Sequence, residues 1–221
     1  MNRSALIYRI LLISVVFIII SGMSQHVQAK TIDGVEYFNT GKFEKAAAIF
    51  REILKGDAEN VQAGYYLGLS LVMQEKYEEA LGIFQNLMDS IDNKDVMKNV
   101  DMPDKGQLEI VIARTYLGLK KYPEALENLE AAEKDNADPV EIHTYKGAYY
   151  LEINENTKAN EELQKALELE SQNAYTYYYA GIAYLRLGDP AKAVKMLKAF
   201  LEMAPFVPEA EHARFLIDTL C

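Results

Sequence analysis

Few residues of this 221-residue chain belong to the types that carry out chemistry, and those few are scattered. The histidines are His26, His143 and His212, and none has a second histidine three or four positions away, where a helix would place two metal ligands on one face. Histidines so isolated are typical of surface or partly packed positions. The one cysteine, Cys221, cannot form a disulfide or a thiolate metal site within a single chain. It is either a terminal residue without a role or the site of an intermolecular disulfide.

Sequence motifs for catalysis are missing as well. The chain contains no GxSxG nucleophile motif and no glycine-rich phosphate loop after a strand. Acidic residues are plentiful, but they occur at helical surface spacings, as in Glu161 and Lys165, where an i,i+4 pair supports a helix. The sequence therefore predicts no catalytic residues, no metal, no cofactor, no small-molecule substrate and no enzymatic activity.

The charge balance excludes two further classes of partner. The formal net charge is -10, whereas proteins that bind nucleic acid or anionic lipid need a basic surface. Half of the residues are hydrophobic, which suffices for a packed core.

The first residues read as a targeting segment. Arg3 and Arg9 precede an apolar run over 10–20, and small residues follow it, which is the layout of a secretory signal. We expect a signal peptide over 1–29 with cleavage after Ala29, or alternatively after Ser24. An uncleaved N-terminal anchor is the other interpretation, although Arg9 interrupts the apolar stretch that a membrane span requires. Either way we expect the rest of the chain to be exported, and to be periplasmic or anchored in the inner membrane facing the periplasm.

The strongest signal in the sequence is an internal repeat of 34 residues, broken by one spacing of 45. Four columns stay in register through five units. The first column holds a small residue, the second a large residue three positions later, the third an alanine, and the fourth a Phe or Leu four positions after the alanine. The columns are Gly34, Gly68, Ala113, Gly147 and Gly181; Tyr37, Leu71, Tyr116, Tyr150 and Tyr184; Ala46, Ala80, Ala125, Ala159 and Ala193; and Phe50, Phe84, Leu129, Leu163 and Leu197.

This spacing predicts two antiparallel helices in each unit. The small residue and the alanine allow the helices to approach closely, and the Phe or Leu fills the space between them. The turn between the helices holds Gly41 in the first unit, Asn154 in the fourth and Gly188 in the fifth, which suit a helix C-terminus. Glu75 and Lys120 stand at the same place in the other two units and are weaker stop signals.

The pattern resembles the tetratricopeptide repeat (TPR) family, most clearly in LGLSLVMQEKYEEALGIF (67–84) and AGIAYLRLGDPAKAVKML (180–197). The resemblance covers about 30–205 and implies an all-α fold: a right-handed superhelical solenoid of five antiparallel helix pairs. The units are expected at about 30–60, 61–94, 106–139, 140–173 and 174–207. A final apolar pattern over 208–221 predicts a capping helix that covers the end of the solenoid.

The widened spacing places an insert near 89–105. Asp89, Asp92, Asn93 and Asp95 fall within it, but the glycine and the closing glutamate of a calcium loop are missing. We therefore expect a solvated connector or an extension of the neighbouring helices.

In TPR proteins the first helix of each pair lines a concave surface, and the resemblance implies that partners bind there. The corresponding face of this chain is apolar and rich in tyrosine, which suits a recognition surface. The candidate partner-binding residues are Tyr65, Leu69, Ile110, Arg114, Thr144, Tyr175, Tyr178 and Ile182. The alternative is that several of them only pack between neighbouring units. If the groove binds a peptide or helix, replacing Tyr65 and Tyr178 by alanine should weaken binding without unfolding the chain.

The sequence thus predicts a scaffold or adaptor that binds a protein or peptide, and the family resemblance points to envelope assembly or secretion. Two other interpretations remain open, a periplasmic holdase-type chaperone and a self-assembling scaffold in which copies of the chain form a homo-oligomer.

Overall fold

A computed structural model describes residues 27–92 and 103–220. Most of the predicted signal segment, part of the predicted insert including Asn93 and Asp95, and Cys221 lie outside these residues. Within them the chain is helical and contains no strand. No helix in the described ranges is both long and apolar enough to cross a membrane.

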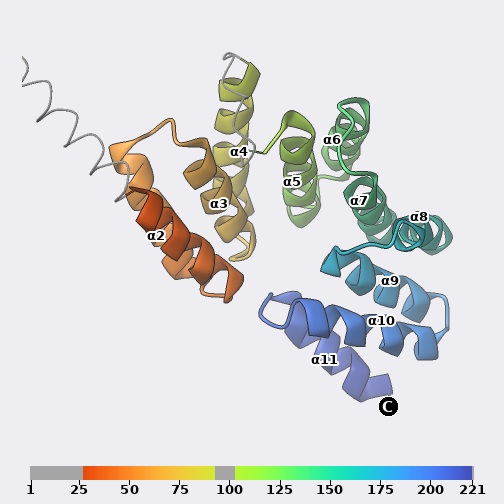
Figure 1. Cartoon of the computed structure of the whole chain (residues 1–221). Coiled ribbons are helices and arrows are strands. Elements are labelled where there is room, and N and C mark those ends of the chain that lie inside the picture. The colour runs from red at the N-terminus through yellow and green to blue at the C-terminus, as the bar shows by residue number, and fades with distance from the viewer. Residues whose placement is uncertain (1–26, 93–102, 221) are drawn as a thin grey trace, which may run out of the picture.

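The helices follow one another in antiparallel pairs along an arc (Figure 1). The first pair is formed by residues 27–39 and α2, and the remaining pairs are α3 with α4, α5 with α6, α7 with α8 and α9 with α10, before α11 ends the chain. This arrangement confirms the predicted all-α solenoid of five helix pairs and a capping helix. The bounds are α2 Phe43–Gly56, α3 Val61–Val72, α4 Tyr77–Asp92, α5 Lys105–Gly118, α6 Tyr122–Lys134, α7 Pro139–Glu152, α8 Asn156–Glu168, α9 Ala174–Arg186, α10 Pro190–Met203 and α11 Glu209–Leu220.

The small residue of each first helix faces the Phe or Leu of its own second helix, as the repeat predicts. A Cβ built on Gly68 would lie 2.4 Å from Phe84 Cε1, and one built on Gly147 would lie 2.5 Å from Leu163 Cγ. A Cβ built on Gly34 would likewise lie 2.7 Å from Phe50 Cζ, and one built on Gly181 would lie 2.7 Å from Leu197 Cγ. The backbones of each pair therefore lie closer together than most side chains would allow.

The turn inside every unit has the same backbone geometry. Gly41, Glu75, Lys120, Asn154 and Gly188 all have φ between 58° and 81°, in the left-handed region. The residue after each of them donates its backbone N–H to the carbonyl of the large second-column residue, as from Lys121 to Tyr116 at 2.9 Å. This is the Schellman motif that ends a helix, so the turns at Glu75 and Lys120 form despite their weak sequence signal.

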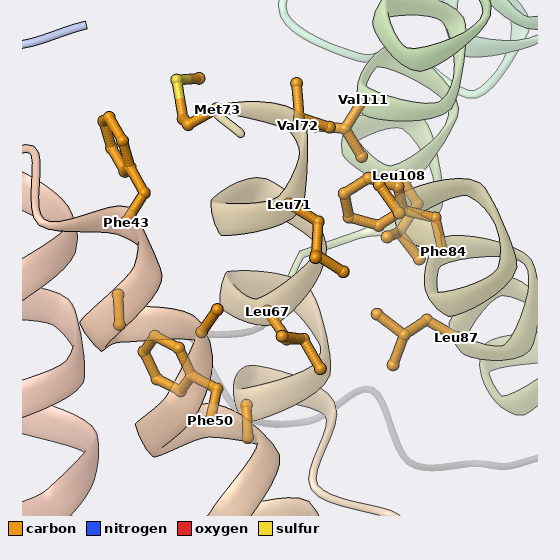
Figure 2. Close-up of a cluster of buried hydrophobic side chains, with 14 of the residues drawn as sticks. Phe43, Phe50, Leu67, Leu71, Val72, Met73, Phe84, Leu87, Leu108 and Val111 are labelled. Carbon is orange, nitrogen blue, oxygen red and sulfur yellow. The ribbon is translucent and has the colours of Figure 1, made fainter. Parts of the chain in front are cut away.

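The buried side chains join successive units into a continuous core. One cluster runs from Phe43 and Phe50 of α2 through α3 and α4 to Leu108 of α5. Figure 2 shows Phe84, Leu108 and Val111 close together where α4 meets α5. Because each cluster is shared by neighbouring units, no unit buries its apolar face alone.

The segment around the predicted insert is partly described. The helix α4 continues to Asp92, and α5 begins after Asp104. Asp104 accepts a hydrogen bond from the Gln107 backbone, and the Gln107 side chain accepts one from the Asp104 backbone, which forms a capping box. Some of the extra residues therefore lengthen α4, one of the two outcomes that the sequence left open.

The two ends of the arc meet. The turn at Gly41 lies against the connection between α10 and α11, where a Cβ on Gly41 would be 2.7 Å from Phe206 Cβ (Figure 1). The core cluster that begins at Phe43 also contains Tyr175 and is flanked by Val207. The concave side of the solenoid is therefore enclosed by elements from both halves of the chain.

The pairing of small and large residues makes a testable prediction about stability. Replacing Gly68 by alanine forces Phe84 to move, which should cost about 1–2 kcal/mol even after the better helix propensity of alanine. The third unit shows the alternative pairing, with Ala113 and Leu129 both fully buried. Adding Phe84→Leu should therefore rescue Gly68→Ala in part. In urea denaturation, the double variant should lose less free energy of unfolding than the sum of the losses of the two single variants. Strictly additive losses would contradict the proposed contact.

Candidate binding groove

A cavity of about 900 Å³ lies on the concave side of the solenoid. Its walls come from the first helices of units two to five, α3, α5, α7 and α9. The turn after residues 27–39 and the segment after α10 also line it. This volume is at the upper end of the range for ligand pockets. We call this space the larger cavity.

Five of the eight predicted groove residues line the larger cavity: Tyr65, Leu69, Ile110, Arg114 and Tyr175. They come from three different first helices. Tyr65 and Leu69 are partly exposed, whereas Ile110 and Tyr175 are buried and offer only part of their surface. Tyrosine is protonated at neutral pH, so the Tyr65 hydroxyl is able to donate a hydrogen bond. Burial raises the pKa of Tyr65 further.

Arg114 is the centre of a polar cluster inside the arc, which we call the arginine cluster. Its guanidinium stacks on the Tyr175 ring with 4.2 Å between Cζ and the ring centroid, and Nη2 donates to the Tyr175 hydroxyl at 2.7 Å. Glu209 completes the cluster, with Oε1 3.8 Å from Arg114 Nη2 and Oε2 accepting from the Tyr175 hydroxyl at 3.2 Å. Met73 Sδ lies 3.9 Å from Nη2. Side-chain exposure is only 13% for Arg114 and 28% for Glu209, so the pair is substantially shielded from water.

The arginine cluster connects parts of the chain that are far apart in sequence. Met73 and Tyr175 are 102 positions apart, and Glu209 begins the capping helix. Cation–π stacking and charge-assisted hydrogen bonds are the strongest kinds of polar contact available to arginine. The cluster therefore holds the third unit to the C-terminal end and fixes the curvature that encloses the larger cavity.

A smaller cavity of about 340 Å³ lies on the other side of the arginine cluster. Met73 and Arg114 line both cavities, so the two are adjacent. Tyr178, the sixth predicted groove residue, lines the smaller one, where its hydroxyl lies 2.8 Å from His212 Nδ1. Its ring is buried against Phe200, with 5.0 Å between centroids. Replacing Tyr178 by alanine would remove core packing, so this substitution is not the clean probe of binding that the sequence suggested.

The remaining two predicted residues line neither cavity. Thr144 is fully buried, donates to the Val140 carbonyl at 2.7 Å and lies 2.6 Å from the Thr176 hydroxyl. It therefore packs α7 against α9, as the alternative interpretation of the face proposed. Ile182 packs against core clusters of the fourth and fifth units.

Sequence reasoning missed the walls that come from outside the first helices. The larger cavity is also lined by Leu169 and Glu170 after α8, and by the segment from Met203 to Val207 after α10. The only sign of these walls in the sequence is that apolar residues, such as Leu169 and Phe206, occur in the connections between helices. Their position depends on the curvature of the whole arc.

The described residues contain no group of three or more His, Cys, Asp or Glu side chains arranged to hold a metal ion. His143 Nδ1 lies 2.7 Å from Glu162 Oε2, between α7 and α8, away from both cavities. The larger cavity offers tyrosine hydroxyls, apolar surface and carboxylates, a combination suited to holding another molecule.

Comparison with known proteins identifies the repeat. The sequence matches tetratricopeptide repeat families over residues 34–92 and 110–175, and again over 162–195. The chain belongs to the tetratricopeptide repeat family. TPR proteins are built as scaffolds for interaction with other proteins, and no curated protein sequence matches this chain significantly.

Solved TPR structures share the fold at low sequence identity. A thermophilic TPR protein of Thermus thermophilus superposes with a TM-score of 0.69 at 21% identity over 88% of this chain and 98% of that one. A TPR protein from Parabacteroides merdae superposes with a TM-score of 0.71 at 17% identity, over 90% of this chain and 74% of that one. The Cut9–Hcn1 hetero-tetramer of the APC/C gives 0.68 at 15% identity over 88% of this chain and 36% of that one. These similarities show the fold alone.

The buried tyrosines predict how stability responds to alkaline pH. Burial raises the pKa of Tyr178 to about 12, against roughly 10 in an unfolded chain. Between about pH 10 and pH 12 the unfolded chain would lose this proton while the folded chain keeps it, so stability falls as pH rises, by up to about 3 kcal/mol for this residue. Tyr178→Phe should flatten that fall, measured as the free energy of unfolding against pH. Parallel curves for the two proteins would show that Tyr178 ionises equally in both states.

Proposed function

We propose that this TPR protein is an exported scaffold or adaptor that holds a peptide or helical segment of a partner protein in the larger cavity. The observation that carries the proposal is the composition and placement of that cavity. It is lined by four first helices and by both ends of the arc, and its walls combine Tyr65, Leu69 and Ile110 with the exposed Leu169 and Phe206.

Apolar side chains exposed around a concave space mark an interaction site. Tyrosine adds contact area and a hydrogen-bonding tip at low entropic cost. The architecture supports the same use, since Cut9, a structural neighbour, assembles with Hcn1. The role proposed for this chain is therefore the binding of another protein.

A role in envelope assembly or secretion is the second part of the proposal. It rests on the N-terminal segment with Arg3, Arg9 and the apolar run over 10–20. A holdase-type chaperone is the alternative, and it would bind many unfolded exported chains in the same cavity.

Two matched leucines provide a sharp test of the cavity. Leu169 and Leu187 each follow the last turn of a helix and are 49% and 46% exposed, but only Leu169 lines the larger cavity. Leu169→Ser should reduce capture of the partner from the native envelope fraction by about tenfold, because a buried leucine contact contributes roughly 1.5–3 kcal/mol. Leu187→Ser should leave capture unchanged. Equal effects of the two substitutions, at equal stability, would place binding elsewhere.

The N-terminus of the exported chain gives a separate prediction. The expected cut after Ala29 falls within the helix over 27–39, and would remove Val27, which packs against the first core cluster. Lys30 would then open the mature chain, still paired with Glu52 at 2.7 Å. We expect N-terminal sequencing of the chain from a periplasmic fraction to begin at Lys30, or at Gln25 if the alternative cut is used. An intact Met1 in the membrane fraction would indicate an anchor, and recovery from the cytoplasm would refute export.

A further inference from the structure

We propose that the segment bound in the larger cavity is cationic as well as apolar, with a lysine or arginine side chain that pairs with Glu141. This inference rests on the proposed function and specifies the chemistry of the partner. It follows from the charges that line the cavity and from the state of Glu141.

The charges around the larger cavity are unbalanced. Asp138, Glu141 and Glu170 line it, and Arg114 is the one basic residue among its described lining residues. Arg114 is already engaged by Glu209 and Tyr175 in the arginine cluster. A partner that enters this space therefore meets an excess of negative charge that the chain itself does not neutralise.

The smaller cavity repeats the imbalance. It is lined by Glu75, Glu152 and Glu209, and apart from the shared Arg114 its described lining residues include no lysine or arginine. Three tyrosines, Tyr77, Tyr178 and Tyr179, complete its walls. Aromatic rings beside carboxylates stabilise ammonium and guanidinium groups through cation–π attraction and ion pairing. The negative potential thus extends along the concave side beyond the larger cavity.

Glu141 is the carboxylate best placed to select a cation. It lies in the first turn of α7 and is partly buried, and it forms no hydrogen bond or ion pair with another described residue. Burial, with Asp138 and Asp104 nearby, raises the pKa of Glu141, and Arg114 offsets this only in part. By contrast, Asp138 accepts a hydrogen bond from the Val140 backbone at 2.9 Å.

A carboxylate held half-buried without a partner costs free energy that an incoming cation would recover. Tyr65 and Leu69 on α3 and Ile110 on α5 line the same cavity as Glu141. A segment that places apolar side chains against α3 and α5 and a basic side chain against α7 would satisfy both parts of the wall. An acidic segment would be repelled.

A displayed library of short random peptides, selected against the purified full chain, tests the inference. We expect the enriched peptides to combine apolar residues with lysine or arginine. Glu141→Gln should weaken their binding about tenfold, because the amide oxygen still accepts a hydrogen bond but the ion pair with the basic side chain is lost. Glu124→Gln is the matched control, since Glu124 lies in the first turn of α6, is likewise partly exposed and lines neither cavity. It removes the same charge and should change binding by less than about twofold.

The outcomes separate the two proposals. Enriched peptides that lack basic residues and bind Glu141→Gln as tightly as the unaltered chain, but lose binding with Leu169→Ser, would overturn the cationic partner and leave the groove in place. Equal weakening by Glu141→Gln and Glu124→Gln would also overturn it, because the attraction would then be due to net charge alone. If neither Leu169→Ser nor Glu141→Gln changes the affinity of the peptides, the proposal that they bind in the larger cavity is refuted.

Discussion

The close approach of the two helices in each unit is the constraint on which the rest of the structure depends. A glycine or alanine in the first helix lies directly against a phenylalanine or leucine of the second, as between Gly68 and Phe84. This contact fixes how far apart the helices of a pair lie. The shared left-handed residue at each turn, such as Lys120, fixes how one helix ends before the next begins. Repetition of one geometry then produces the arc.

A second level of organisation acts on the arc as a whole. Arg114, Tyr175 and Glu209 form one largely shielded polar cluster, and the turn at Gly41 meets Phe206 at the far end of the chain. These contacts draw the ends of the solenoid together, so that residues from both ends line one cavity on the concave face. Shape and recognition are therefore linked, because the residues that set the curvature also separate the two cavities.

The helix pairs could be predicted from the sequence because they depend on short-range, repeated spacing. The columns at Gly147 and Leu163, for example, are sufficient to place two helices against each other. The cavity walls could be predicted only in part. Thr144 shares the helical spacing of the residues that line the cavity, but it lies where α7 meets α9. Whether a residue of this face lines the cavity or packs between units depends on the angle between neighbouring units. The pairing of Arg114 with Glu209 was beyond reach, because it requires knowing that the capping helix returns to the third unit.

Site-specific photocrosslinking shows whether a partner is held inside the larger cavity. A photoreactive side chain would replace Leu169 in the full chain within cells that produce it, and Leu187 would serve as the outer position. If a partner is held there, position 169 should crosslink to one dominant protein, through one segment that mass spectrometry locates, and position 187 should not. Equal labelling from both positions, a spread of unrelated proteins, or adducts confined to other copies of this chain would contradict it.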